Sequence, residues 1–269
     1  MWRGCPIWAS RVRTDCPAWA PPLLALQFLT RMPVPGLGGL SGEAVRIGLG
    51  RAVGWFPLAG ALIGGVTASV LVVADAFWPR LVAVLLALLA EAWLTGAFHE
   101  DAVADFCDAF GGGRDAEAIR RIMKDSRIGS HGALGLMLGV GLRAALLVAL
   151  PSVLLVPALL GSATFGRLLV VAAMAAVAPA PAREGLAKDV AAAVGARQLA
   201  LALLAALPGL LPLLLLAPGR LLLACGGGTL FLAWFRSLLR RSIGGSTGDC
   251  LGFSAYVGQL ILLLAIAAR

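Results

Sequence analysis

One short segment of this sequence concentrates its acidic residues. Residues 99–131 contain seven of the 14 Asp and Glu residues, and both histidines of the chain bound the segment. Asp101, Asp105 and Asp108 are spaced i, i+4, i+7, which places three carboxylates on one face of a helix. Carboxylates stacked in this way repel one another unless a cation lies between them, and hard oxygen ligands suit Mg²⁺ carried with a phosphate group. The spacing therefore predicts a Mg²⁺-diphosphate site.

A solvated acidic helix face just outside a bilayer would have the same spacing. The apolar residues Leu94, Ala97 and Phe98 directly before the acids place the helix at a membrane boundary. Unpaired acids are expensive at that depth and are usually functional. The position of the segment favours the metal site over the solvated face.

A basic loop follows the acidic helix. Its polar and small residues are Lys124, Asp125, Ser126, Arg127 and Gly129. Arginine can bind two phosphate oxygens at once, lysine supplies a point charge, and glycine lets a ligand approach the backbone. The loop could hold phosphate, and a basic turn that only fixes membrane topology is the open alternative.

Other isolated polar residues also need an explanation. Asp249 follows a polar turn ending in Thr247 and Gly248 and directly precedes an apolar run, so it is either a helix cap or a ligand. His99 could act as a general base or as a hydrogen-bond donor to phosphate. Glu91 lies inside an apolar stretch and would need a partner if buried, and nothing in the sequence identifies one.

The composition requires these residues to be carried by a membrane protein. Of 269 residues, 60% are apolar and 13% are charged, and the mean hydropathy is +0.92. A soluble chain would need more polar surface. The apolar residues occur in runs rather than in alternation, which favours helices over a barrel. We therefore expect an all-α polytopic integral membrane protein.

Charge and cysteine content exclude other classes. The net charge is +8, but the basic residues are scattered at the ends of apolar runs, which indicates anchoring at an anionic membrane surface and no nucleic-acid partner. The five cysteines form no CxxC pair and have no metal-ligand spacing. A disulfide framework or a zinc site is therefore not expected.

The apolar runs predict six or seven transmembrane helices, several of them kinked by proline or glycine. Four runs have full length and three are shorter. The long runs are 52–74, 144–166, 198–219 and 250–268, and the short runs are 81–98, 168–182 and 221–235. We expect residues 1–22 to form a basic cytoplasmic tail. Residues 23–269 are expected to form a single transmembrane domain with a polar active-site segment at 95–131.

Five blocks of sequence carry a specific resemblance. They are ALQFLTRMPVP at 25–35, WFPLAG at 55–60, the acidic block at 95–113, MKDSRIG at 123–129 and GGSTGDCLG at 244–252. In this order they resemble the cobalamin synthase family, the adenosylcobinamide-GDP ribazoletransferases of the inner membrane. The resemblance covers most of the chain from residue 23 onward.

The resemblance implies a Mg²⁺-dependent final step of cobalamin assembly, in which α-ribazole or its 5′-phosphate displaces GMP from adenosylcobinamide-GDP. The metal ligands implied are Asp101, Asp105 and Asp108, with Glu100 or Asp249 completing the set. Lys124 and Arg127 would neutralise phosphate, and His99 or a spare carboxylate would accept the alcohol proton. The implied phosphate-binding residues are Lys124, Asp125, Ser126, Arg127, Gly129, Thr247 and Gly248.

The resemblance and the charge pattern together imply a location and partners. Arginines precede the first long span and share the acidic segment, so both regions are expected to face the cytoplasm from a multi-pass position in the inner membrane. The expected partners are the two substrates, the lipid bilayer and other cobalamin-assembly enzymes.

Two alternatives belong to other classes of protein. A CDP-alcohol phosphotransferase also displaces a nucleotide with membrane carboxylates, but its signature has glycine where Ala102 follows Asp101. A cation transporter would place its acids at mid-span and often shows repeat symmetry, whereas these acids cluster at one boundary.

Overall fold

The computed structural model describes residues 15–180 and 194–268, and its regular elements in these ranges are all helical. Apolar runs and proline positions determine where most of the helices begin and end. In chain order they are α1 (Ala20–Leu29), η1 (Leu37–Gly39), α2 (Gly42–Ala52), η2 (Val53–Trp55), α3 (Phe56–Asp75), α4 (Arg80–Thr95), α5 (Phe98–Gly112), α6 (Ala116–Ile122), α7 (Ser130–Ala149), α8 (Ser152–Ala176), α10 (Ala196–Leu216), α11 (Pro218–Ser242) and α12 (Gly248–Ala267).

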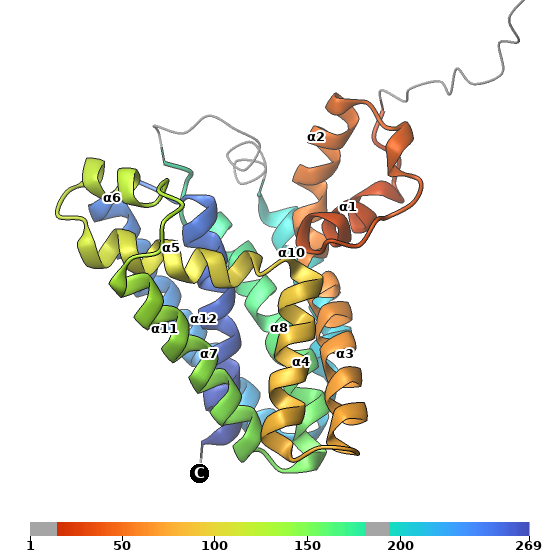
Figure 1. The fold of residues 1–269 in the computed structure, drawn as a ribbon. Coiled ribbons are helices and arrows are strands. Elements are labelled where there is room, and N and C mark those ends of the chain that lie inside the picture. Colours follow the sequence, from red (N-terminus) through yellow and green to blue (C-terminus); the bar gives the residue numbers. More distant parts are fainter. Residues whose placement is uncertain (1–14, 181–193, 269) are drawn as a thin grey trace, which may run out of the picture.

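Six helical stretches are long and apolar enough to cross a membrane, and α4 together with α5 would make a seventh. The six are the continuous stretch Gly42–Asp75 and the helices α7, α8, α10, α11 and α12. This confirms the expected all-α polytopic architecture with six or seven spans. Figure 1 shows these helices running side by side, with α5 lying across one end and the C-terminal end of α12 at the other.

Two predicted spans were placed wrongly. The runs 144–166 and 168–182 do not form separate helices, because α7 ends at Ala149 and α8 runs from Ser152 to Ala176. Pro151 lies between them as the N-cap of α8, where its missing N–H costs nothing. Residues 181 and 182 lie outside the described residues. The other predicted runs coincide with α3, α4, α10 and α12 within a few residues, and α11 extends seven residues beyond the predicted run 221–235.

Prolines lie inside three of the spans, at Pro57 in the stretch Gly42–Asp75, at Pro157 in α8 and at Pro208 and Pro212 in α10. The most buried spans are α8 and α12, and α8 packs against α3, α10 and α12. Only 17% of the apolar stretch of α11 is buried, as expected for a helix whose outer face meets lipid. The centre of the bundle is therefore built around α8.

The corner between α4 and α5 turns the chain by 89°. Gly96 and Ala97 both have positive φ, 72° and 55°, a conformation that is uncommon for alanine. The backbone N–H of Arg31 donates to the carbonyl of Leu94 at 2.8 Å and ties the end of α1 to this corner. The turn places the acidic helix α5 across the end of the bundle (Figure 1).

The start of the folded chain lies slightly earlier than predicted. Helix α1 begins at Ala20, three residues inside the predicted tail, because proline suits the first turn of a helix. Residues 1–14 of that tail lie outside the described residues.

Candidate active site

The carboxylates predicted to share a helix face do so on α5, and α12 adds one more. Helix α12 packs against α5. Burial, followed by the negative charges of Asp101, Asp249 and Asp108, raises the pKa of Asp105 to about 6. Because this helix lies across the bundle end, outside the six spans, the carboxylates can meet a water-borne substrate. The crowding of negative charge is what a bound cation would relieve.

These carboxylates do not form a complete protein cage for a metal. Within the described residues, no three histidine, cysteine or carboxylate side chains are grouped closely enough to hold an ion by themselves. Mg²⁺ is usually held by one or two carboxylates together with substrate phosphates and water. Carboxylate oxygens from α5 and α12 fit an ion of that kind, which arrives with a diphosphate.

Glu100 lies apart from this acidic face. Its electrostatic neighbours are Glu91, Arg143 and Arg167, which belong to a buried polar cluster, and its Oε2 has no hydrogen-bond partner. Of the two residues expected to complete the metal site, Asp249 is therefore the better placed.

Asp108 has a contact that distinguishes it from the other aspartates. Its two carboxylate oxygens accept from the backbone N–H groups of Gly129, at 2.6 Å, and of Gly132, at 2.8 Å. Both amides belong to the N-terminus of α7, where an anion is favourable. A Cβ atom at either glycine would overlap the carboxylate of Asp108. The amide of Gly129, which was expected to approach a phosphate, is thus occupied by Asp108.

The basic loop forms a hollow beside this contact. A cavity of about 430 Å³ is lined by Asp108, Asp125, Arg127 and Gly129, among others. The Arg127 guanidinium donates to the carboxylate of Asp125 at 2.6 Å and holds the pKa of that carboxyl down at about 2. Lys124 and Ser126 are exposed on the same loop. The loop therefore presents two cations, Lys124 and Arg127, to a phosphate. Arg127 is already paired with Asp125.

The start of α12 resolves the question of which residue is its cap. The Oγ1 atom of Thr247 accepts from the backbone N–H of Cys250 at 3.3 Å, so Thr247 is the N-cap. Gly248 is the first helical residue and Asp249 lies in the first turn. Thr247, and not Asp249, is therefore the residue that caps the start of α12.

A backbone bridge fixes the position of this turn. The N–H of Ser246 donates to the carbonyl of Ala178 at 2.9 Å, and the N–H of Ala180 donates to the carbonyl of Ser246 at 3.0 Å. The segment that follows α8 is thus paired with the segment that precedes α12.

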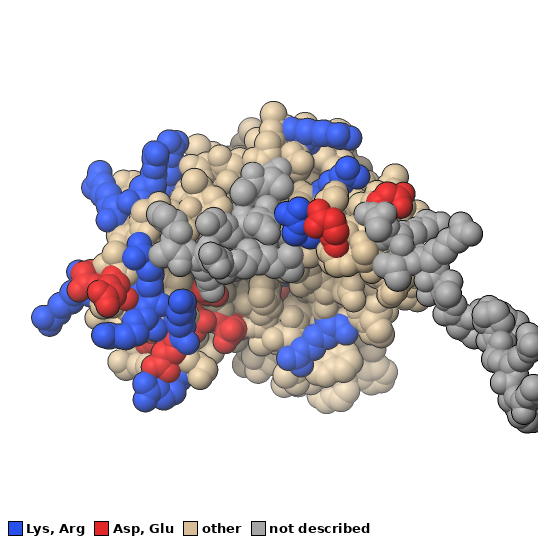
Figure 2. Space-filling view, turned by 90° about the horizontal axis from the view of Figure 1, so that it is seen from above, with Lys and Arg blue, Asp and Glu red and all other residues tan. Residues whose placement is uncertain are grey.

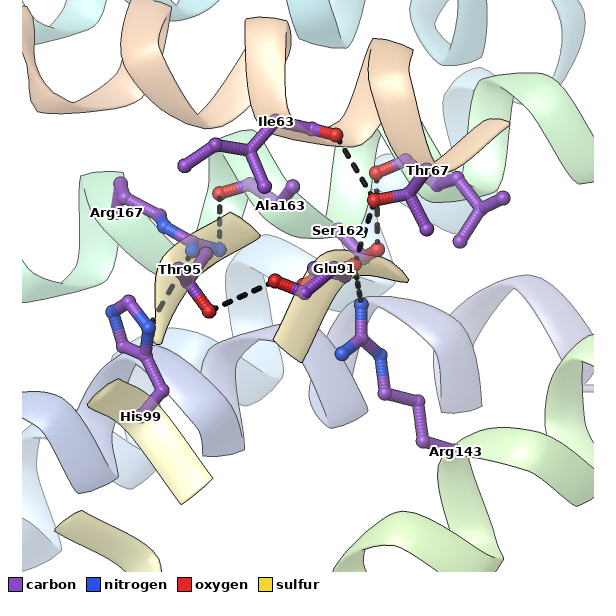
Figure 3. Close-up of polar contacts among 10 residues, drawn as sticks. Ile63, Thr67, Glu91, Thr95, His99, Arg143, Ser162, Ala163 and Arg167 are labelled. Carbon is purple, nitrogen blue, oxygen red and sulfur yellow. Dashed lines mark hydrogen bonds and ion pairs between the residues drawn. The ribbon is translucent and has the colours of Figure 1, made fainter. Parts of the chain in front are cut away.

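Glu91 finds its partner in Arg143. The guanidinium of Arg143 donates to Glu91 Oε2 at 2.7 Å, and the hydroxyl of Thr67 donates to the same oxygen at 3.0 Å. Both charged side chains are buried (Figure 3). The pair lies beneath α5, in the centre of the bundle.

His99 joins the same cluster through Arg167. One guanidinium nitrogen of Arg167 lies 3.5 Å from Nδ1 of His99, and both side chains are buried (Figure 3). Arginine only donates, so Nδ1 accepts and the proton of a neutral His99 resides on Nε2. A second proton would place a third positive charge beside Arg143 and Arg167. This arrangement supports hydrogen-bond donation by His99 and disfavours its use as a general base.

Arg143 and Arg167 are the polar residues of this region that the sequence interpretation missed. Each flanks the predicted span 144–166 and was treated as an end residue. Their signal was present, because each has apolar residues on both sides within a window long enough to span. Arginines buried in a span mark polar clusters of this kind.

Comparisons with known proteins show similarity to one family over most of the chain. A family model described as cobalamin-5-phosphate synthase matches residues 21–267. A protein of Leptothrix cholodnii, named adenosylcobinamide-GDP ribazoletransferase, is 40% identical over 250 residues, covering 88% of this chain and 93% of its own length. Proteins of the same name from Shewanella amazonensis and Sinorhizobium medicae are 39% and 38% identical, covering 91% and 93% of this chain and 93% and 96% of their own lengths. No solved structure matches the chain.

Proposed function

This chain belongs to the cobalamin-5-phosphate synthase family, and we propose that it catalyses the final assembly step of adenosylcobalamin. Adenosylcobinamide-GDP donates its cobinamide phosphate to α-ribazole or to α-ribazole 5′-phosphate. The products are adenosylcobalamin or its 5′-phosphate, and GMP. The observation that carries the proposal is the approach of Asp249 to the α5 carboxylates beside a basic loop.

The reaction exchanges one bond to phosphorus for another. An oxygen of a ribose hydroxyl bonds to the phosphorus that carries cobinamide, the bridge of the diphosphate breaks, and GMP leaves with the bridging oxygen. The hydroxyl proton passes to a carboxylate or to water. Such a transfer depends mainly on positioning and on neutralising charge.

The residues of the site divide these tasks. Asp101, Asp105 and Asp249 would hold Mg²⁺, which when bound neutralises the diphosphate and activates it for attack. Lys124 and Arg127 would bind the phosphates of the nucleotide, and their exposure leaves them accessible to it. Asp108 keeps the loop in place by holding the N-terminus of α7.

We propose that the α5 end of the bundle faces the cytoplasm from the inner membrane. Figure 2 shows acidic side chains close to basic ones on this face. Its described loops and helix ends carry many basic residues, whereas the opposite end carries Arg80 and Arg220. Positive charge accumulates on the cytoplasmic side of membrane proteins. The basic residues at the α5 end include Arg31, Arg46, Arg51, Arg114, Arg121, Lys124, Arg127, Arg197, Arg240 and Arg241.

The test is a reaction with purified protein in detergent. The protein is incubated with adenosylcobinamide-GDP and α-ribazole, with Mg²⁺ or with EDTA, and GMP and adenosylcobalamin are followed by chromatography. Equimolar release of both products with Mg²⁺, and none with EDTA, is the expected result. Folded protein that releases no GMP would contradict the proposal. Membership of the family disfavours the CDP-alcohol phosphotransferase and the cation transporter.

A further inference from the structure

An apolar cavity of about 300 Å³ lies beside the carboxylates of the site. This volume is at the lower end of the range for pockets that take small molecules. Helices α1, α3, α5, α8 and α12 contribute its walls. Its apolar side chains are Phe28, Leu29, Phe56, Phe98, Val170, Met174 and Leu251.

The aromatic walls of the cavity pack on one another. The ring of Phe28 stacks on that of Phe56 with centroids 5.7 Å apart, and it meets Phe98 edge-on at 5.9 Å. Aromatic side chains in these orientations bind a further flat ring well. Asp249 lines the cavity too and is one of the residues that raise the pKa of Asp105. The cavity therefore adjoins the site of phosphoryl transfer.

His99 supplies a hydrogen-bond donor to this cavity. The ring lines the cavity and is 3% exposed. Its Nδ1 faces Arg167, and Figure 3 shows the dashed contact on that nitrogen and none on the other. No described residue forms a hydrogen bond with Nε2, which carries the proton. Because the ring lines the cavity, an acceptor on a ligand there could pair with this N–H.

The charges near the cavity indicate a neutral ligand rather than an anion. The buried cluster behind His99 contains two carboxylates, Glu91 and Glu100, and two guanidinium groups, Arg143 and Arg167. These charges sum to zero when all four groups are ionised. Arg167 and Asp249, which line the cavity itself, also carry opposite charges, so the cavity has no excess positive charge for an anion to neutralise.

We propose that this cavity binds the aromatic base of the nucleoside acceptor, an inference that rests on the proposed function. The base of α-ribazole is dimethylbenzimidazole, a flat apolar bicycle with one unsubstituted ring nitrogen that accepts a hydrogen bond. Nε2–H of His99 donates to that nitrogen, and the ribose extends toward Asp249. The guanine of the other substrate has several donors and acceptors, which these apolar walls would leave unsatisfied.

The first experiment changes one atom of the acceptor. Kinetics are measured with α-ribazole and with its indole analogue, in which a C–H replaces the unsubstituted ring nitrogen. A site that hydrogen-bonds this nitrogen rejects the analogue, and we expect KM to rise by about tenfold or more. In His99→Phe, which keeps a ring but lacks the donor, KM for the two acceptors should become similar. Equal KM values in the unaltered protein, or discrimination retained in His99→Phe, would overturn the inference.

A second variant fills the cavity without touching His99. Met174→Trp should raise KM for α-ribazole by about tenfold and leave KM for adenosylcobinamide-GDP unchanged. Leu230→Trp, on the exposed face of α11, is the matched control and should change neither value. A rise confined to adenosylcobinamide-GDP would assign the cavity to the other substrate.

Binding of the free base separates this inference from the proposed function. Equilibrium dialysis of dimethylbenzimidazole against the unaltered protein should show saturable binding that Met174→Trp weakens by about tenfold. Base binding without release of GMP would contradict the proposed reaction and keep the cavity assignment. Release of GMP with no base binding, and with unchanged KM in Met174→Trp, would support the proposed reaction and contradict the cavity assignment. If the cavity holds lipid and does not take up the base, the assignment would also be overturned.

Discussion

Glu91 and Arg143 form a buried ion pair between α4 and α7, with Oε2 and a guanidinium nitrogen 2.7 Å apart. The two residues are 52 positions apart in the sequence. A buried charge is tolerated when its partner is present and becomes costly when the partner is removed. The pair therefore joins α4, which precedes α5, to α7, which follows α6.

Glu91→Gln should destabilise the protein by about 3 to 5 kcal/mol, because Arg143 would remain buried without a counter-charge. Unfolding in detergent, followed by temperature or denaturant, measures the change. The double variant Glu91→Leu with Arg143→Met removes both charges and should recover most of the loss. A Glu91→Gln protein as stable as the original would show that the pair is unimportant for folding.

Asp108→Ala should loosen the basic loop and lower stability by about 1 to 2 kcal/mol, since the N-terminus of α7 loses its capping carboxylate. Hydrogen exchange at the amides of Gly129 and Gly132 should accelerate. Asp115→Ala, which removes the N-cap of the short helix α6, is a control that should leave these two amides unchanged. Unchanged exchange in Asp108→Ala would contradict the cap.

Asp105→Asn should separate function from folding. The substitution relieves repulsion among carboxylates and is expected to leave stability unchanged or slightly raised. Release of GMP should fall by about 100-fold or more, as when a group that stabilises the transition state is lost. An active variant that still depends on Mg²⁺ would refute the role of Asp105 as a metal ligand.

Mg²⁺ should raise the unfolding temperature of the unaltered protein when adenosylcobinamide-GDP is present, because a ligand that binds the folded state stabilises it. The shift should be small in Asp105→Asn. Ca²⁺ serves as a comparison ion, since it prefers more oxygen ligands at longer distances. An equal shift in both proteins would place the ion elsewhere.

Arg127→Ala should raise KM for adenosylcobinamide-GDP by about tenfold, with little change in stability, because the side chain is exposed. Asp125→Asn should lower the same KM, since it releases Arg127 from its ion pair. The two variants are thus predicted to act in opposite directions. Parallel effects would indicate that the pair only shapes the loop.

The acidic helix was predictable because its information is local. The spacing of Asp101, Asp105 and Asp108 determines that they share a face, and α5 carries them so. The number of spans followed from apolar length in the same way, although the bounds of α7 and α8 did not. The separate role of Asp108 could not be read from that spacing, because it depends on the position of α7, which begins 22 residues later.

The buried cluster shows the limit of such reasoning. An arginine next to an apolar run looks the same in sequence whether it ends the span or lies within it. Arg143 lies within the span because it pairs with Glu91, and only the packing of α4 on α7 brings the two residues together. Arg167 likewise depends on the corner that turns His99 toward α8.

The bridge between Ser246 and residues 178–180 sets the relative depth of two helices. Arg167 lies on α8 and Asp249 on α12, and the paired backbone that joins the ends of these helices prevents one from sliding along the other. Main-chain atoms form the bridge, and the hydroxyl of Ser246 adds a contact to the carbonyl of Val177 at 3.3 Å. A residue inserted or deleted between the bridge and either helix would shift the α8 wall of the cavity relative to the α12 wall. The chain length here, together with Gly245, where a Cβ atom would collide with the backbone of Ala178 and Ala180, therefore sets how the two helices align.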